Sequence, residues 1–281
     1  MGEGHKPEHA EAPPTGVGDT QQRLDPLQFV APTEFVELPS QGKAYPANHP
    51  LHNEETIEIR FMTAKDEDIL SSKTLLKKGV AIERFMQNIV VNQKINVKKL
   101  LVADRNAILI AARVSGYGDQ YETKVTCPSC EAVSESLFNL NDKKISHIEA
   151  REDLNIKKTD NGTFLVTMPL TKHEIEFRLL TGEDENAIAR SSESRRKQRL
   201  SETMLTDQYK RMIVAVAGHT SREIIRKYVD NMPTRDSRFL RNCYKATAPE
   251  IKISEDFNCH SCGFEQEMEV PFGADFFWPN G

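Results

Sequence analysis

The sequence lacks a long hydrophobic run. Its longest apolar stretches, residues 107–112 and 212–217, are far shorter than the roughly 18 residues needed to cross a bilayer. The N-terminus has no apolar signal core, so we expect a protein that is neither secreted nor anchored in a membrane. Basic charge is not in excess either: 37 Lys and Arg residues face 42 Asp and Glu residues, for a net charge of −5. This balance disfavours a general polyanion binder, which is usually basic overall.

Motifs of the common enzyme classes are absent as well. The chain has neither of the glycine-rich phosphate loops, Gly-x-x-x-x-Gly-Lys-Ser/Thr and Gly-x-Gly-x-x-Gly. It also has no Gly-x-Ser-x-Gly nucleophile turn and no His-Glu-x-x-His zinc motif. Its acidic residues form no pair suited to acid–base catalysis. We therefore expect a protein without enzyme activity and without a small-molecule substrate.

Cysteine is scarce, with five in the chain, but four of them form two identical Cys-x-x-Cys pairs. The pairs are Cys127 with Cys130 and Cys259 with Cys262. Disulfides are rare in a reducing compartment, so paired cysteines with strand-like flanks indicate metal ligands. A Cys-x-x-Cys turn at a hairpin tip supplies two sulfur ligands, and Zn²⁺ takes four in a tetrahedron. We predict one structural zinc site formed by all four, as in a zinc ribbon.

Other interpretations of the cysteines stay open. The pairs are also compatible with a redox site, with an iron–sulfur cluster or with a remnant that no longer binds metal. Catalytic zinc is disfavoured, because such sites usually keep three protein ligands and one open position. We interpret His260, inside the second pair, as a turn residue, and Cys243, in an apolar helical stretch, as a buried thiol.

The hydrophobic patterns predict an α+β fold in which one unit occurs twice. Each unit contains two alternating strands, a helix opened by a Thr-x-x-Asp capping signature, further helices and a Cys-bearing hairpin. In the first copy, the strands are residues 35–38 and 56–62 and the cap is residues 63–66. The last helix is residues 104–115, and the hairpin strands are 121–126 and 132–140. In the second copy, the strands are residues 163–168 and 174–180 and the cap is residues 181–184. The last helix is residues 235–245, and the hairpin strands are 251–253 and 264–270.

The spacing between the two copies is not constant. The capping signatures are 118 positions apart and the Cys pairs 132, so the second copy needs 14 additional residues in its helical middle. There we expect helices at residues 81–92 and 97–103 in the first copy, and at 209–217 and 224–229 in the second. The additional length includes a polar segment, residues 191–199, which we interpret as a solvated insert. The alternative is that its positive charge binds an acidic protein partner. The cationic residues in and directly before the segment are Arg190, Arg195, Arg196, Lys197 and Arg199.

Three regions follow from these patterns. Residues 1–33 are rich in Pro, Gly, Glu and Thr and lack periodicity, so we expect a disordered arm. Residues 34–150 form the first repeat and residues 151–281 the second. The C-terminal segment holds three Phe residues and the only Trp of the chain, Trp278. Aromatic residues at this density either fold back onto the core or anchor a neighbouring subunit.

A nucleic-acid-binding or transcription-associated zinc ribbon is the rival hypothesis, because zinc ribbons often contact nucleic acid. Acidic residues around the Cys pairs argue against it, since a negative surface repels phosphates. These residues are Glu122, Glu131, Glu135, Glu255, Asp256, Glu265, Glu267 and Glu269. The basic segment lacks the interleaved aromatic residues on which bases stack. We therefore expect protein partners.

Several segments, taken in order, resemble the T4-type baseplate proteins of contractile-tail phages, the family assigned to the baseplate hub and its assembly. They are residues 38–45 (Leu-Pro-Ser-Gln-Gly-Lys-Ala-Tyr), 57–70 and 95–118, the two Cys pairs, and residues 276–279 (Phe-Phe-Trp-Pro). The resemblance begins near Phe35 and covers most of the chain. It implies a non-catalytic role, with other baseplate and tail proteins as partners.

The location that the resemblance implies is the virion tail baseplate, or the host cytoplasm during tail assembly. A permanent component and a transient chaperone both remain open. In either case we expect zinc to clamp the two repeats and so fix the surfaces that bind other baseplate subunits.

Overall fold

The computed structural model describes residue 1 and residues 31–148, 154–201, 203–270 and 276–277. Residues 2–30, nearly all of the predicted arm, lie outside this part of the chain, as does Trp278. The described residues mix helices with short strands, in agreement with the α+β composition expected from the sequence.

Within the described residues, the strands form five antiparallel sheets. They are β1 (Thr33–Glu37), β2 (Thr56–Arg60), β3 (Gln120–Thr126), β4 (Val133–Asn139), β5 (Lys144–Ser146), β6 (Lys157–Lys158), β7 (Phe164–Thr167), β8 (Glu174–Phe177), β9 (Ile213–Val216), β10 (Glu250–Lys252), β11 (Ser254–Asn258) and β12 (Glu265–Glu269). Four sheets have two strands, β1–β2, β3–β4, β5–β10 and β11–β12, and the fifth has the order β6-β7-β8-β9.

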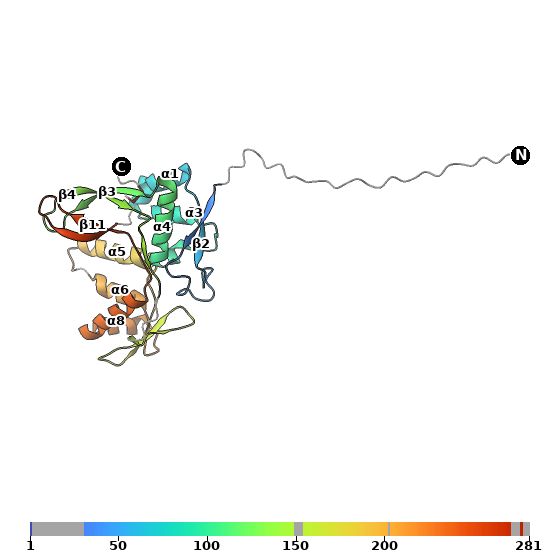
Figure 1. The fold of residues 1–281 in the computed structure, drawn as a ribbon. Helices are drawn as coiled ribbons and strands as arrows, with labels where there is room; N and C mark the ends of the chain where they lie inside the picture. The colour runs from blue at the N-terminus through green and yellow to red at the C-terminus, as the bar shows by residue number, and fades with distance from the viewer. Residues whose placement is uncertain (2–30, 149–153, 202, 271–275, 278–281) are drawn as a thin grey trace. The chain divides into compact units, whose positions relative to one another are not determined.

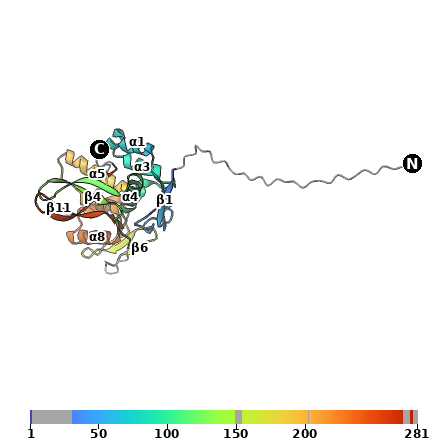
Figure 2. The same ribbon diagram turned by 45° about the horizontal axis from the view of Figure 1, so that its top comes forward.

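Helices connect these sheets (Figure 1). They are α1 (Ala64–Ser71), α2 (Lys73–Lys77), α3 (Ala81–Ile89), the 3₁₀ helix η1 (Val97–Lys99), α4 (Val102–Tyr117), α5 (Gly182–Lys197), α6 (Met204–Met212), α7 (Arg222–Asp230) and α8 (Thr234–Thr247). Helix α4 lies between the β1–β2 pair and the β3–β4 hairpin in both views (Figures 1 and 2). It buries residues on nearly every side, among them Ile108, Leu109 and Ile110, as expected of a helix in the core.

The first strand pair leads directly into a capped helix. Strands β1 and β2 are antiparallel, and Val36, Ile57 and Ile59 are buried in alternation with less buried neighbours, as the sequence predicts. Thr63 then caps α1, because its backbone N–H and its hydroxyl both donate to the carboxylate of Asp66, at 2.9 and 2.8 Å.

The second strand pair is followed by the same local arrangement. Strands β7 and β8 are antiparallel, with Phe164, Ile175 and Phe177 buried. Thr181 caps α5, and its N–H and hydroxyl donate to Asp184 at 3.0 and 2.9 Å. Both Thr-x-x-Asp signatures therefore open helices, as predicted.

Two predicted helices were wrong in part. The helix predicted over residues 209–217 ends at Met212, and Ile213–Val216 form strand β9, which pairs with β8. This segment is rich in β-branched residues, which favour a strand where a sheet edge is available. Residues 97–103 are not one helix, because the extended backbone of Leu100 and Leu101 separates the short η1 from the start of α4 at Val102.

The basic segment is mostly exposed, as expected of a solvated segment. Helix α5 continues through it to Lys197, so most of residues 191–199 are helical. In the first copy, the predicted single helix after Thr63 is divided at Ser72, whose extended backbone separates α1 from α2. The capped helix of the second half therefore has 16 residues against 8 in α1, which accounts for part of its additional length.

Backbone pairing links residues that the sequence assigns to different repeats. Strand β5 pairs with β10, with Ile145 opposite Ile251. Farther along, the amide of Gly182 donates to Leu100 O at 3.0 Å and Leu101 forms an isolated bridge with Thr181. Neither link was predicted, because nothing in the local pattern of one segment specifies its distant partner.

The C-terminal segment returns to the core at its two described residues. Phe276 and Phe277 are 1% and 2% exposed. The ring of Phe276 packs 5.0 Å from Tyr121, and that of Phe277 packs edge-on 5.1 Å from Phe85. The sequence left open whether this segment folds back onto the core or anchors a neighbouring subunit. These two rings fold back onto the core.

Candidate metal centre

The first Cys pair lies in the turn that joins β3 to β4. The amide of Cys127 donates to Ala132 O at 2.8 Å, and the amide of Glu131 donates back to Cys127 O at 2.9 Å. These bonds close the turn tightly, and the amide of Ala132 donates to the sulfur of Cys130. The hairpin and its Cys-bearing tip are therefore present as predicted.

The second Cys pair lies in a turn with matching bonds, between β11 and β12. The amide of Cys259 donates to Phe264 O at 2.9 Å, and the amide of Gly263 donates to Cys259 O at 2.8 Å. Amides of Ser261 and Cys262 donate to the sulfur of Cys259. Each turn thus aims backbone N–H groups at sulfur, the arrangement expected of a Cys-x-x-Cys metal turn.

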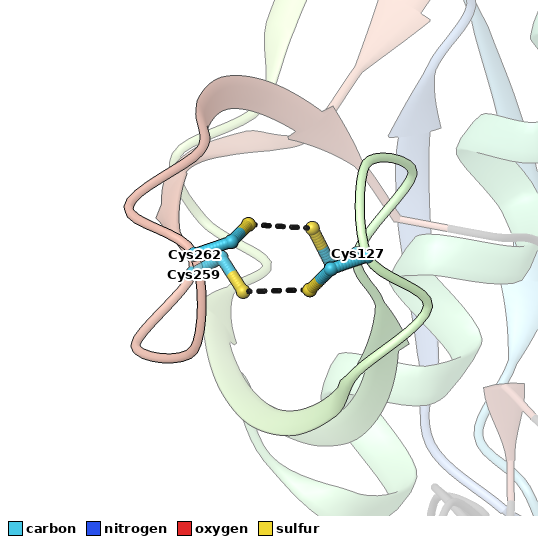
Figure 3. Close-up of side chains that lie close together, drawn as sticks. Cys127, Cys259 and Cys262 are labelled. Atoms are coloured by element: carbon cyan, nitrogen blue, oxygen red, sulfur yellow. Dashed lines mark hydrogen bonds between the residues drawn. The ribbon is translucent and has the colours of Figure 1, made fainter.

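The two turns face one another and bring the four sulfurs together. Strands β4 and β11 lie side by side in both views (Figures 1 and 2), which places the hairpin tips next to each other. Sγ of Cys127 lies 3.8 Å from Sγ of Cys262, and Sγ of Cys130 lies 3.6 Å from Sγ of Cys259. All four sulfurs lie within 4.8 Å of one another. Figure 3 shows the side chains of Cys259 and Cys262 directed toward that of Cys127 across the gap.

The donor set and its spacing fit a zinc ion. Four sulfurs bonded to Zn²⁺ at about 2.3 Å in a tetrahedron are about 3.8 Å apart. The two cross-hairpin distances, 3.8 and 3.6 Å, agree with that value. They are far longer than the roughly 2.05 Å of a disulfide, so the sulfurs are not covalently paired. Soft thiolates in a tetrahedron are the donors that zinc and iron–sulfur sites share.

The electrostatics of the cluster favour a cation. Donation from the amides of Cys262 and Ser261 lowers the pKa of Cys259 to about 6, so this thiol ionises readily. For Cys130, the amide of Ala132 acts in the same direction, but hydrogen bonds with Cys262, Cys259 and Cys127 outweigh it and raise the pKa to about 12. Four sulfurs this close resist simultaneous ionisation unless a cation lies between them.

Burial divides the cluster into two inner and two outer cysteines. Cys127 and Cys259 are 0% and 3% exposed, whereas Cys130 and Cys262 are exposed. The fifth cysteine, Cys243, is buried in the hydrophobic core on α8 and does not join the cluster. His260 is exposed and also lies outside the group, consistent with its interpretation as a turn residue.

The surroundings of the cluster are acidic, as the sequence predicts. A groove of about 290 Å³ between the hairpins is lined by residues of β4 and β11, and Glu135, Glu255 and Asp256 contribute its charged groups. On the neighbouring strand β12, Glu267 and Glu269 are exposed. A phosphate backbone would be repelled from this face of the hairpins.

Two buried aspartates outside the cluster were missed by the sequence reasoning. Asp104, on α4, accepts hydrogen bonds from Ser40 Oγ and Tyr45 Oη, both at 2.7 Å. Asp236, on α8, accepts from the amide of Leu170 at 2.8 Å and from Thr171 Oγ1 at 2.7 Å. Both aspartates are 0% exposed. Each lies in the first turn of its helix, and that position is the one signal that the sequence offered.

Comparisons with known proteins identify the family. A family model described as T4 bacteriophage base plate protein matches residues 31–278. The chain belongs to this family. It is therefore a structural phage protein of the tail baseplate, in agreement with the resemblance seen in the sequence. No curated protein and no solved structure matches this baseplate protein. Among its described residues, no helix combines the length and the apolar character that spanning a membrane requires.

Proposed function

We propose that this baseplate protein is a non-enzymatic hub or hub-assembly component that acts by binding other tail proteins, with one structural zinc held by Cys127, Cys130, Cys259 and Cys262. The observation that carries the proposal is the convergence of two hairpin tips, 132 positions apart in the chain, on one cluster of four sulfurs that lie within 4.8 Å of one another. A zinc ion held by all four sulfurs would have no position open for a substrate, which supports a structural role.

We also propose that the two halves arose by duplication. Arg60 binds Asp66 through two hydrogen bonds of 2.7 and 2.9 Å. Arg178 binds Asp184 through two bonds of the same lengths. The capping threonines, the matching hairpin turns and the buried aspartates at equivalent places on α4 and α8 support the same interpretation. Under this proposal the zinc site is the point at which both copies contribute equivalent ligands.

The proposed role of the zinc is to hold the two hairpins in one fixed arrangement. When bound, the ion supplies four bonds to sulfur, two in each hairpin, and neutralises the charge that the thiolates bring. The chain itself supplies the turn amides that orient the sulfurs. Because β5–β10 and the Leu101–Thr181 bridge also join the halves, the ion is needed mainly at the hairpin end. A rigid hairpin pair then presents its acidic outer face to a partner subunit.

The first test is the metal content of the purified protein. Plasma mass spectrometry is expected to find about one zinc per chain, and far less in the double variant Cys130→Ser/Cys262→Ser, which removes the two exposed ligands. Cys243→Ala is the matched control, because it removes a cysteine that lies outside the cluster. Iron in place of zinc, or full zinc content in the double variant, would contradict the proposed site.

The second test concerns the place of action. Mass spectrometry of purified virions separates a permanent baseplate component, present in intact tails, from an assembly factor found only in lysates. A salt-titrated DNA-binding assay addresses the rival hypothesis. Micromolar binding that weakens steeply with salt would favour a nucleic-acid role and overturn the proposed one.

A further inference from the structure

A cationic cleft lies on the second half of the chain, away from the cysteines. It has a volume of about 490 Å³ and is lined by residues of α5, α6 and α7 and by Arg178, which directly follows β8. The lining residues are Arg178, Asp184, Ala187, Ile188, Ser191, Asp207, Lys210, Arg211, Arg222 and Arg226. Five of them are cationic and two are carboxylates. The cleft therefore has a local excess of positive charge, although the net charge of the chain is −5. A concave site with this excess attracts an anionic ligand.

Part of this positive charge is already compensated within the cleft. Asp184 accepts two hydrogen bonds from Arg178 and lies 3.5 Å from Arg211. Lys210 pairs with Asp230 at 2.7 Å. The other lining carboxylate, on Asp207, accepts hydroxyl hydrogen bonds from Ser191 and Thr203. These ion pairs and hydrogen bonds hold the polar side chains of the cleft in place.

The remaining cations are Arg222 and Arg226 on α7. Both are exposed, and neither forms an ion pair within the described part of the chain. Arg222 donates to the backbone oxygen of Lys210 at 3.1 Å, which holds its guanidinium at the cleft. Arginines that face a cleft without a carboxylate partner are available for the two-point binding that a guanidinium makes with an anion.

The basic part of α5 extends the cleft. Asp184, Ile188 and Ser191 line the cleft from one face of α5, at helical spacing, and Arg195 follows one turn later in the same row. Arg195 donates to Ser201 O at 3.0 Å and is thereby held in place. The cationic surface is therefore longer than the cleft itself, as a bound segment with several charges requires.

The chemistry of the lining favours an acidic polypeptide over a nucleic acid. None of the ten lining side chains is aromatic, so bases have no ring to stack on. Asp184 and Asp207 place two carboxylates in the path that a continuous phosphate backbone would follow. A peptide with spaced Asp and Glu side chains is able to direct its carboxylates to the arginines and avoid these two positions.

We propose that this cleft binds an acidic segment of a neighbouring baseplate protein, through Arg222 and Arg226. The inference rests on the proposed function, since it names the chemistry of a binding partner. It does not depend on the metal: the cleft is formed by α5, α6 and α7, and none of its residues is a cysteine.

The test measures binding of a fluorescently labelled glutamate-rich peptide to the purified, zinc-loaded full chain, by fluorescence anisotropy. A single-stranded DNA of the same formal charge is measured in parallel. The unmodified protein is expected to bind the peptide more tightly than the DNA. The variant Arg222→Glu/Arg226→Glu is expected to weaken peptide binding by about tenfold or more, because charge repulsion replaces attraction at the cleft.

The matched control is Lys73→Glu/Lys77→Glu on α2, which makes the same change in net charge at exposed residues outside the cleft. Equal weakening in both variants would show that net charge alone governs binding, and would overturn the proposal. So would the absence of peptide binding, or tighter DNA binding that depends on the two arginines. If the double variant fails to fold, Arg226→Gln decides, since this exposed residue has no described partner. Absence of zinc from the purified protein would instead count against the proposed function and leave the cleft measurement standing.

Discussion

At the scale of single residues, the two Cys turns differ at a position where both have left-handed backbone. Glu131 and Gly263 occupy equivalent places and have positive φ angles of 61° and 70°. A side chain in this left-handed region costs roughly 1–2 kcal/mol, whereas glycine adopts it freely. The first turn therefore contains a conformational cost that the second avoids.

The corresponding prediction uses exchanges at these two positions. Gly263→Ala is expected to lower the free energy of unfolding by about 1 kcal/mol, although a methyl group there meets no atom within 4 Å. Glu131→Gly is expected to raise it by a similar or smaller amount. Chemical denaturation of the zinc-loaded proteins measures both. If Gly263→Ala has no effect, the turn does not keep its left-handed backbone in solution.

The cysteines were the residues that the sequence identified best. Their spacing and their strand-like flanks were enough to predict that all four come together, and the sulfurs do converge. The buried Asp104 was not identified, because its partner Ser40 lies 64 positions away. A single Asp near the start of a helix is also typical of a solvent-exposed cap. Side-chain partners of this kind depend on tertiary packing that local patterns do not encode.

At the scale of elements, the start of α1 is a titratable unit. Asp66 is fully buried, with its side chain 0% exposed. Although burial by itself raises its pKa, hydrogen bonds from Arg60, Thr63 and Asn88 outweigh that effect and lower the pKa to about 2. Because the folded pKa lies below 3.8, the ordinary value for an aspartate, ionised Asp66 stabilises the fold fully above about pH 4. That stabilisation is lost as the pH falls toward 2.

Asp66→Asn tests this unit. We expect the variant to unfold with a free energy lower by about 2 kcal/mol at neutral pH, because the charge that Arg60 and the capping N–H require is gone. The difference between the variant and the unmodified protein should shrink as the pH falls from about 4 to 2. Denaturation at several pH values measures the difference, and a constant gap would rule out a lowered pKa for Asp66.

Asp184→Asn provides the companion measurement on α5. The pKa of Asp184 is also lowered, mainly because the guanidinium of Arg178 and the amide of Thr181 overcome the effect of burial. A loss of stability at neutral pH in the same direction is expected. Opposite signs for the two variants would weaken the proposed equivalence of the two capped helices.

Elements were predicted well where one face of the segment is buried and local signals agree. The alternation in β1, β2, β7 and β8 and the two capping signatures are such cases. The prediction failed at residues 213–216, where an apolar run reads equally well as helix or strand and the open edge of β8 decides. It also failed at residues 100–101, whose extended backbone is fixed by the contact with residues 180–182.

At the scale of the whole molecule, the links that join the two halves differ in kind. The β5–β10 pair and the Leu101–Thr181 bridge consist of backbone hydrogen bonds. The cysteine cluster joins the hairpin tips by side chains from residues up to 135 positions apart. Metal removal is therefore expected to release the hairpins from each other while the helical part stays folded.

Chelation tests this division. Fixing two points that far apart in a chain is worth roughly 4–5 kcal/mol in the entropy model for cross-links. Removal of the metal by a chelator is therefore expected to lower the Tm by about 10 °C. Hydrogen exchange followed by mass spectrometry should show faster exchange in β3, β4, β11 and β12, with little change in α4 and α8. Readdition of zinc should restore both the Tm and the exchange pattern. Uniform loss of protection throughout the chain would mean that the cluster stabilises the whole fold and not the hairpins alone, and an unchanged Tm would mean that the four sulfurs hold no structural ion.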